Sequence, residues 1–409
     1  MKKYFDLAID ILTYVIDKEV PFKVAVNNFI KKETKLTATD KNDIISLVGC
    51  SLRHYYIFSY LINKKYNEIP HEHLYLLFIT FANRLFVKKY PDSELVSIVL
   101  QRIHLDDMEE FVNDVNDVNK LIPEEINRRS NLYYSLRYNV PTWVVNMIRK
   151  QYGLVNLIKF LRTNNVNKVN TYRIIRKDDL EGFDYIDDDF VHYVGETKIQ
   201  YSKAYQNKNV VRLEPFYRNL LNEIDYDPYR GIGFFVGSNN DIIKEMFART
   251  GQSLNFDLLV EGKTVLFNIK KQLEAFKLSG IQLYECAHTS IITCLSNKVH
   301  TFFVCPINTE LNRLNNEPDY FLRINQNDLD QFIINQIETL ENAKEFVELG
   351  GQLIYFVPTL SNKETNNVIN KFLNDNDDFV LTKAHQSYNF ESDLLTGYYA
   401  ILTRVKEHD

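Results

Sequence analysis

Apolar residues follow a helical spacing through the first third of the chain. Between residues 40 and 60 they recur at intervals of three and four, which predicts one amphipathic helix. A second helix is expected between Pro70 and Pro91, because prolines stand where helices begin or stop. No stretch before about Asn127 alternates like a strand. This part is therefore expected to be an all-α bundle of five to seven helices.

From Gly231 onward the pattern changes to short apolar runs separated by helical stretches such as 328–347. The predicted strands are 232–236, 265–269, 281–284, 301–304, 353–357, 379–382 and 398–403. Gly350 and Gly351 are expected to stop a helix before the strand that runs into Pro358. Strands that alternate with helices predict a parallel doubly wound sheet, and the last two strands suggest an antiparallel closing pair.

Length and composition are those of a globular protein with two or three domains, since the chain has 409 residues, 45% hydrophobic and 25% charged. The four cysteines are too widely spaced for a disulfide framework and are expected to pack as reduced thiols. Apolar runs are too short to span a membrane, and the first residues lack a signal-peptide core. We therefore expect a cytoplasmic, monomeric protein that does not contact a membrane.

Positive charge is concentrated in residues 131–180, which hold nine basic and two acidic residues. This local charge of +7 leaves −13 for the rest of a chain whose net charge is −6. The segment is expected to face RNA phosphates, although a merely solvated positive face stays open. The acidic run 181–189 is expected to be a solvated loop. Metal binding by Asp187, Asp188 and Asp189 is not expected, because three adjacent carboxylates cannot all point at one ion.

Three stretches carry a resemblance to known families. Residues 40–53 resemble the helical RNA-binding domain of NusB-type proteins. Residues 135–153, with Pro141 and the single tryptophan Trp143, are similar to the segment that joins two domains in the bacterial Sun/Nop family of rRNA cytosine-5 methyltransferases. The matches in the C-terminal block occur in family order and spacing and are Gly350-Gly351, Leu353-Ile354-Tyr355, Glu364, Asn366-Asn367-Val368, Phe372-Leu373 and Gly397-Tyr398-Tyr399.

The resemblance implies a fold of α plus α/β class in three parts. Residues 1–128 would form a NusB-like helical RNA-binding domain. Residues 129–205 would form a small basic α+β subdomain that also binds RNA. Residues 206–409 would form a Rossmann-like domain with the seven-stranded sheet of class I S-adenosylmethionine-dependent methyltransferases.

The same resemblance implies a reaction whose residues are missing here. The family adds a cysteine thiolate to the cytosine ring, steadies the base with an acid, and releases the product with a second cysteine. At these positions the chain has Pro358, Val304 and Ile307, respectively. Cys305, two residues before the family's cysteine, is a candidate for a shifted nucleophile, but a buried strand-end thiol is the preferred interpretation.

The cofactor implied by the resemblance is S-adenosylmethionine. The family's glycine-rich turn is replaced by Gly237, Ser238, Asn239 and Asn240. Asn268 is expected where class I enzymes place an acid against the ribose, and its neutral carbonyl is a weaker acceptor. These replacements predict that tight cofactor binding is lost.

The partner implied by the resemblance is structured RNA, above all rRNA. The residues expected to contact it are Arg53, Arg137, Arg149, Lys150, Arg173, Arg176 and Lys177. Because several site residues are replaced together, the leading hypothesis is an RNA-binding pseudoenzyme. Two alternatives stay open, namely an active rRNA cytosine-5 methyltransferase with a rearranged site and a NusB-like antitermination or interaction module.

Overall fold

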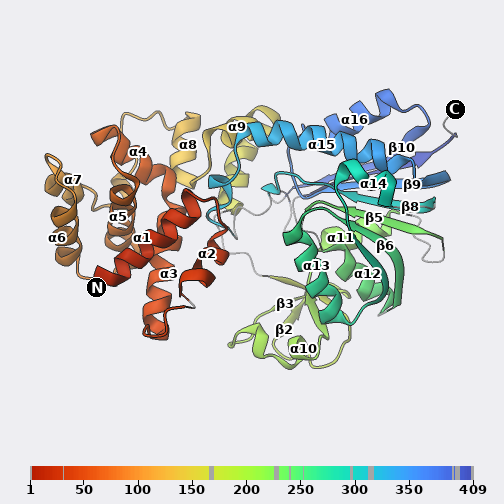
Figure 1. The fold of residues 1–409 in the computed structure, drawn as a ribbon, viewed down its shortest axis with the longest axis horizontal. Coiled ribbons are helices and arrows are strands. Elements are labelled where there is room, and N and C mark those ends of the chain that lie inside the picture. Colours follow the sequence, from red (N-terminus) through yellow and green to blue (C-terminus); the bar gives the residue numbers. More distant parts are fainter. Residues whose placement is uncertain are drawn as a thin grey trace. The chain divides into compact units, whose positions relative to one another are not determined.

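The chain forms two compact units. The computed structural model describes residues 2–30, 32–164, 170–224, 230–238, 241–251, 253–294, 298–311, 317–388, 391 and 397–406. The helical unit comprises Met1–Asn165 and Arg313–Gln326, and the sheet unit comprises Val166–Asn312 and Asn327–Asp409 (Figure 1). A separate subdomain over residues 129–205 stays a prediction, because the boundary between the two units lies inside it.

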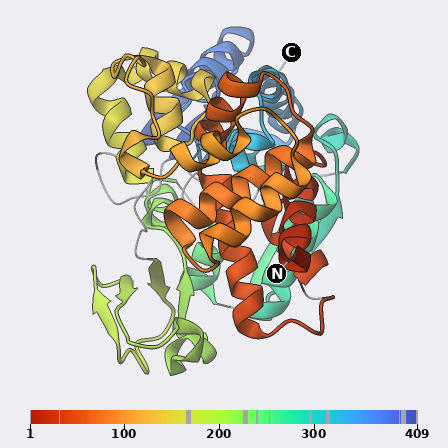
Figure 2. The ribbon, with the colours of Figure 1, turned by 90° about the vertical axis from the view of Figure 1, so that its left-hand side faces the viewer.

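Figure 2 shows the helical unit as a bundle of helices. The apolar core that most of them share is formed by buried residues between Phe5 and Leu136. Its helices are α1 (Lys2–Ile16), α2 (Phe22–Ile30), α3 (Ala38–Arg53), α4 (Tyr55–Tyr66), α5 (His71–Ala82), the π-helical turn η1 (Asn83–Val87), α6 (Asp92–Arg102), α7 (Met108–Asp114), η2 (Val118–Lys120), α8 (Asn131–Tyr138) and α9 (Thr142–Asn164). The described residues before position 127 thus hold seven α-helices, which agrees with the five to seven expected.

The helix expected over residues 40–60 is in fact two helices, α3 and α4. They meet at His54, whose φ of −122° and ψ of 17° are not helical. The His54 ring stacks on Phe86 with centroids 4.0 Å apart, and its Nδ1 lies 2.9 Å from the carbonyl oxygen of Cys50. Apolar periodicity continues across such a break, so spacing alone did not reveal it.

The segment before α15 (Gln326–Lys344) returns to the helical unit through its 3-10 turn η6 (Tyr320–Leu322). The backbone N–H of Phe22 donates to Asp319 at 3.0 Å, and the Tyr56 hydroxyl donates to the carbonyl of Phe321 at 3.3 Å. The Trp143 ring lies edge-on to Phe321 with centroids 6.3 Å apart. The single tryptophan therefore packs against a segment that is distant in sequence.

The sheet unit contains a seven-stranded sheet in the order β10-β11-β9-β8-β5-β6-β7. Its strands are β5 (Ile232–Val236), β6 (Ser253–Val260), β7 (Ser279–Glu285), β8 (Val299–Cys305), β9 (Val347–Val357), β10 (Phe379–Ser387) and β11 (Gly397–Arg404). Strands β5 to β9 pair in parallel, whereas β11 pairs antiparallel to both β9 and β10. The expected parallel sheet with an antiparallel closing pair is confirmed.

Helices cover both faces of this sheet (Figure 1). They are α11 (Pro215–Asn222), α12 (Ile242–Thr250), α13 (Lys263–Phe276), the turn η4 (His288–Ser290), α14 (Ile291–Cys294), α15 and α16 (Asn366–Asp375). In β8, Phe303 and Cys305 join the core with α11, α12 and α13. Phe302 and Val304 join the core with α14, α15 and α16. The period-2 alternation of one strand thus fills two apolar layers.

Six of the seven predicted strands lie within observed strands, and one prediction was wrong. Residues 265–269 belong to α13, where Val265, Leu266, Ile269 and Leu273 follow helical spacing and pack on the sheet. The second strand is instead β6, which the apolar pattern did not predict. Four of these five residues are apolar. A segment this short fits a strand or a buried helix face equally well, so the spacing of its apolar residues cannot distinguish the two.

Gly350 and Gly351 do not stop a helix, because α15 ends at Lys344 and both glycines lie inside β9. The pairing of β8 with β9 shifts register at this point. Gly350 has a φ of +76°, and a Cβ on Gly351 would lie 2.7 Å from the carbonyl oxygen of His300. The pair therefore marks an irregularity where two backbones approach closely.

A second, antiparallel sheet in the order β2-β3-β1-β4 belongs to the same unit. Its elements are β1 (Thr171–Ile174), β2 (Phe183–Tyr185), β3 (Phe190–Tyr193), η3 (Ile199–Tyr201), α10 (Lys203–Gln206) and β4 (Val210–Arg212). The acidic run 181–189 is thus not a plain solvated loop, since it contains β2 and carboxylates that bind arginines. The local charge pattern could not reveal arginines supplied by other elements.

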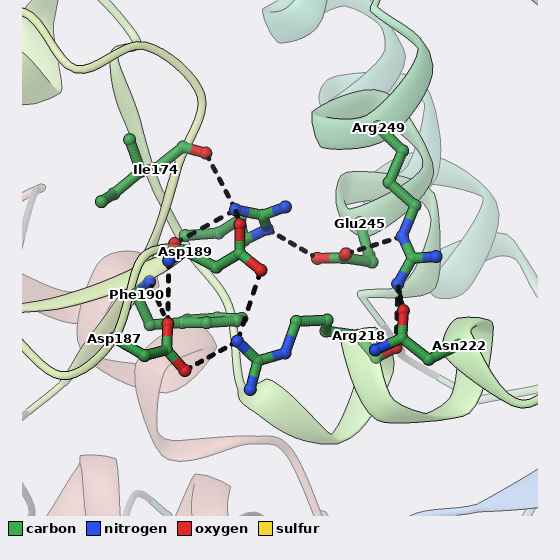
Figure 3. A network of polar contacts seen from close by, with 9 residues as sticks. Ile174, Asp187, Asp189, Phe190, Arg218, Asn222, Glu245 and Arg249 are labelled. Carbon is green, nitrogen blue, oxygen red and sulfur yellow. Dashed lines mark hydrogen bonds and ion pairs between the residues drawn. The ribbon is translucent and has the colours of Figure 1, made fainter.

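A network of ion pairs joins this small sheet to α11 and α12 (Figure 3). Glu245 of α12 is fully buried and accepts from Nε of Arg173 at 3.1 Å and from Nε of Arg249 at 2.9 Å. Arg173 also donates to Asp189 at 2.6 Å. The guanidinium of Arg218 lies 4.9 Å from the centroid of the Phe190 ring and donates to Asp187 at 2.7 Å. The small sheet is therefore held by paired charges around one aromatic ring.

Replacing Glu245 with Gln should destabilise the sheet unit, because two arginines lose a charged acceptor. Hydrogen bonds to charged groups contribute about 1.5–3 kcal/mol each, so a loss of at least about 2 kcal/mol is expected. For a unit of this size that lowers the melting temperature by about 4–8 °C, measured by calorimetry. The exposed Asp184 of β2 provides the control, and Asp184→Asn should leave the melting temperature unchanged. Equal melting temperatures for the two variants would contradict the importance of the network.

Candidate functional site

The loops that follow the central strands meet at one edge of the seven-stranded sheet. Backbone N–H groups just past each strand bond to the end of a neighbour: Gly237 to Cys305 at 2.8 Å, Glu261 to Val236 at 2.9 Å, and Cys286 to Val260 at 3.0 Å. Because the carboxyl ends of parallel strands lie together, this edge is where doubly wound sheets bind ligands. The candidate site is built from these loops.

The loop after β5 begins with a glycine that its surroundings require. A Cβ on Gly237 would lie 2.8 Å from the backbone nitrogen of Ile307 and 3.3 Å from Oε2 of Glu261. Ser238 is buried, and its hydroxyl accepts from the amide of Asn308 at 2.8 Å. Asn239 and Asn240, also expected near the cofactor, lie outside the described residues. Gly237 therefore lies too close to Ile307 and Glu261 for a side chain, although the loop lacks the further glycines expected from the resemblance.

Glu261, and not Asn268, stands at the end of the second strand. The prediction for Asn268 was wrong because that residue lies in α13. The Glu261 carboxylate lies 2.7 Å from Nδ1 of His288 through Oε1, which also accepts from the His288 backbone at 3.2 Å. Its Oε2 lies on the side of Gly237. The end of the second strand therefore carries an acidic residue, where a neutral amide was predicted.

Glu261 could have been found from the sequence once β6 was recognised. The run from Phe256 to Val260 is apolar except for Asp257, and an acid and a glycine follow it directly. That is the signature of a strand that ends in a polar loop. Asn268 was named because the second strand was placed at the wrong residues. The expectation of a polar residue at the end of that strand was correct.

Residues at the family's catalytic positions offer no exposed reactive group. Val304 and Cys305 have 0% exposure within β8, and Pro358 directly follows β9. Ile307 has an aliphatic side chain that cannot act as a nucleophile or an acid. The Sγ of Cys305 lies 3.7 Å from the buried hydroxyl of Ser238 and belongs to an apolar core. A nucleophilic thiol must reach its substrate as an accessible thiolate, and this one does not.

The loops after β8 and β9 are tied together by a buried glutamate that the sequence reading did not assign to the site. Glu364 has 0% exposure and accepts from the backbone N–H of Thr309 at 2.8 Å and from its hydroxyl at 2.5 Å. The Thr359 hydroxyl and the Gln336 amide donate to it at 3.2 Å. Burial raises the pKa of Glu364, although the hydrogen bonds from Thr309 act in the opposite direction. The Glu364 carboxyl group therefore links the loops after β8 and β9 through hydrogen bonds.

The residues expected to contact RNA are divided between the two units. Arg53, Arg137, Arg149 and Lys150 belong to the helical unit, and Arg173, Arg176 and Lys177 belong to the sheet unit. Arg53, Arg137, Lys150, Arg176 and Lys177 are exposed.

Two of these arginines are engaged within the protein. Arg149 donates to the carbonyl of Arg129 at 2.8 Å and to the side chain of Asn131 at 2.9 Å. The side chain of Arg173 is 11% exposed and is bound to carboxylates. RNA contact by these seven residues stays a prediction.

Neither a metal cluster nor a membrane span is found in the part of the chain that the structure describes. No group of three or more His, Cys, Asp or Glu side chains there could hold a metal ion. No described helix is both long and apolar enough to cross a bilayer.

Comparisons with known proteins identify the fold. No family model matches the sequence, and no curated protein matches it. The solved structure of PH0851 is similar with a TM-score of 0.74 over 98% of both chains, at 12% identity. A methyltransferase homolog protein from Pyrococcus horikoshii has a TM-score of 0.56 at 12% identity, covering 68% of this chain and 99% of its own.

NSun6 from Pyrococcus horikoshii with SFG has a TM-score of 0.55 at 10% identity, covering 69% of this chain and 99% of its own. At these identities the likeness is one of fold. The mixed architecture, with a helical N-terminal region and a methyltransferase-like sheet, is confirmed. A NusB-like character of the helical region stays a prediction.

The buried Glu364 predicts a distinctive pH dependence of stability. Its pKa is raised in the folded state from the ordinary 4.5, so folding favours the protonated form. The stabilisation is full below the unfolded pKa and is lost as pH rises through the folded pKa. The melting temperature of Glu364→Gln minus that of the wild type should therefore increase as pH rises from about 4.5 to neutrality. The exposed Glu196→Gln variant should track the wild type, and a Glu364→Gln minus wild-type difference that falls with rising pH would contradict the raised pKa.

Proposed function

We propose that the protein binds structured RNA, in particular rRNA, and transfers no methyl group to it. The observation that carries the proposal is the contrast between a fold shared over 98% of the chain with PH0851 and the residues Pro358, Val304 and Ile307, which supply neither a nucleophile nor an acid at the expected catalytic positions. The nucleophile position is Pro358, and the nearby thiol of Cys305 is fully buried. Apolar packing maintains the fold, whereas polar residues in the loops carry out the reaction. A fold can therefore persist after its reaction is lost.

The alternative of an active enzyme with a rearranged site requires Cys305 to reach an extruded base. That thiol lies among Phe234, Phe303 and Ile354 in the sheet core. Exposing it would require β8 to leave the centre of the sheet, at the cost of many apolar contacts. The burial of Cys305 therefore favours the inactive protein.

Methyl transfer should accordingly be absent when the purified protein is incubated with labelled S-adenosylmethionine and rRNA from its own organism. The same preparation should bind rRNA fragments with an affinity that falls steeply with salt, because lysines and arginines displace counterions from phosphates. Cys305→Ser should leave RNA binding unchanged. Transfer of label to the RNA, or a covalent RNA adduct that Cys305→Ser abolishes, would refute the inactive-protein hypothesis.

The loops after β5 and β6 can accommodate S-adenosylmethionine. The loops after β8 and β9, in contrast, lack the residues that methyl transfer to cytosine requires. Glu261 Oε1 is engaged by His288, whereas Oε2 lies beside the space that a Cβ on Gly237 would fill. A carboxylate in this place can accept from ribose hydroxyls, and a glycine lets a ligand approach the backbone. We therefore include weak binding of S-adenosylmethionine, through Glu261 and Gly237, in the proposal.

Calorimetric titration with S-adenosylmethionine tests this part of the proposal. Glu261→Gln should weaken binding by about 10-fold or more, since hydrogen bonds to a charged group contribute about 1.5–3 kcal/mol. The exposed Glu274→Gln on α13 is the matched control and should bind like the wild type. An absence of heat with the wild type would remove the cofactor from the proposal and leave the RNA-binding function untouched.

A further inference from the structure

A cavity of about 600 Å³ lies in the helical unit, away from the candidate site at the sheet edge. It is bounded by α4, η1, η2, α8 and the segment that joins η2 to α8. A second cavity of about 320 Å³ shares Lys120, Leu121 and Pro123 with it. Cavities of this size accept ligands as large as a nucleotide. The shared wall makes the two hollows neighbours along one loop.

The lining of the larger cavity carries a net positive charge. Lys120, Arg128 and Arg137 line it, and Glu124 is the single carboxylate among its lining residues. Within the described part of the chain none of the three basic side chains makes an ion pair with a carboxylate. Exposed cations without a carboxylate partner can still form charge-assisted hydrogen bonds with a phosphate. The cavity therefore favours an anionic ligand.

Aromatic rings form another part of the lining. Arg137 donates to the hydroxyl of Tyr133, and its guanidinium lies 5.7 Å from the centroid of that ring. Phe86, which also lines the cavity, stacks on His54 with an interplanar angle of 21°. Burial lowers the pKa of His54 and so favours the neutral ring, which adds aromatic surface. An aromatic ring can stack on a nucleotide base, and a nearby cation without a carboxylate partner can bind the phosphate of that nucleotide.

We propose that this cavity holds an unpaired nucleotide of a bound RNA strand. The base would pack on Tyr133 or Phe86, and Arg128 and Arg137 would neutralise the flanking phosphates. Lys120 lies on the wall shared with the smaller cavity, where the strand can continue. The inference rests on the proposed RNA-binding function and assigns one of its sites. Since stacking and phosphate contacts do not read base edges, sequence preference at this site is weak.

The test measures binding of a fluorescently labelled single-stranded RNA of about ten nucleotides, within the usual range of single-strand sites, to the full chain by anisotropy. Arg128→Gln with Arg137→Gln should weaken binding at least 10-fold and reduce the salt slope by about 1.4, the value for two phosphate contacts on a single strand. Tyr133→Leu should weaken single-strand binding by about 5-fold or more, because stacking contributes about 1–3 kcal/mol per base. Melting temperatures establish that each variant is folded.

The matched control is Lys18→Gln with Lys23→Gln, which removes two exposed charges from the same unit outside the cavity. It should bind the strand within about 2-fold of the wild type, since neither side chain lines the cavity. Photocrosslinking of the wild type to a 4-thiouridine strand should label peptides that contain Tyr133 or Phe86, and this readout does not depend on any variant.

Three results would overturn the inference. If the Arg128 and Arg137 double variant binds as the control does and no crosslink falls in the cavity, RNA is bound elsewhere and the proposed function survives. If free uridine monophosphate binds as tightly as the strand, the cavity is a small-molecule site. If the wild type binds neither the strand nor rRNA fragments, the proposed function and this site fail together.

Discussion

Burial of β8 on both faces is the constraint on which the rest of the sheet unit depends. All seven residues of this strand are buried, and successive side chains enter opposite apolar layers. A parallel sheet covered by helices on both sides leaves its central strands no solvent-facing position. Val304 and Cys305 are therefore core residues, and functional chemistry can come only from the loops beyond the strands.

Those loops differ in how their polar side chains are used. After β8 and β9, Glu364 gathers hydrogen bonds from Thr309, Thr359 and Gln336, so polar groups that could have faced a substrate satisfy one another instead. After β5 and β6, Gly237 and Glu261 keep a close backbone approach and a partly accessible carboxylate. The two halves of the edge thus differ in the polar groups that they leave accessible to a ligand.

Positive charge along the sequence does not by itself define a binding surface. The basic segment 131–180 includes Arg173, which serves an internal network, and Arg137, which lines an open cavity. Both residues contribute equally to the charge count. What separates them is whether the fold brings a carboxylate to the guanidinium, since a buried pair has no remaining attraction for a phosphate.

The sequence alone determined that a helical part precedes a part in which strands and helices alternate, because hydrophobic periodicity records which face of each element is buried. It therefore predicted the helical bundle, six strands and the antiparallel closing pair. It failed at 265–269, where a short apolar run fits both periods, and so misplaced the acid of the second strand. Only the tertiary structure decided the partners of charged groups: Arg173 and Glu245 are 72 positions apart, and no local pattern encodes a contact at that separation.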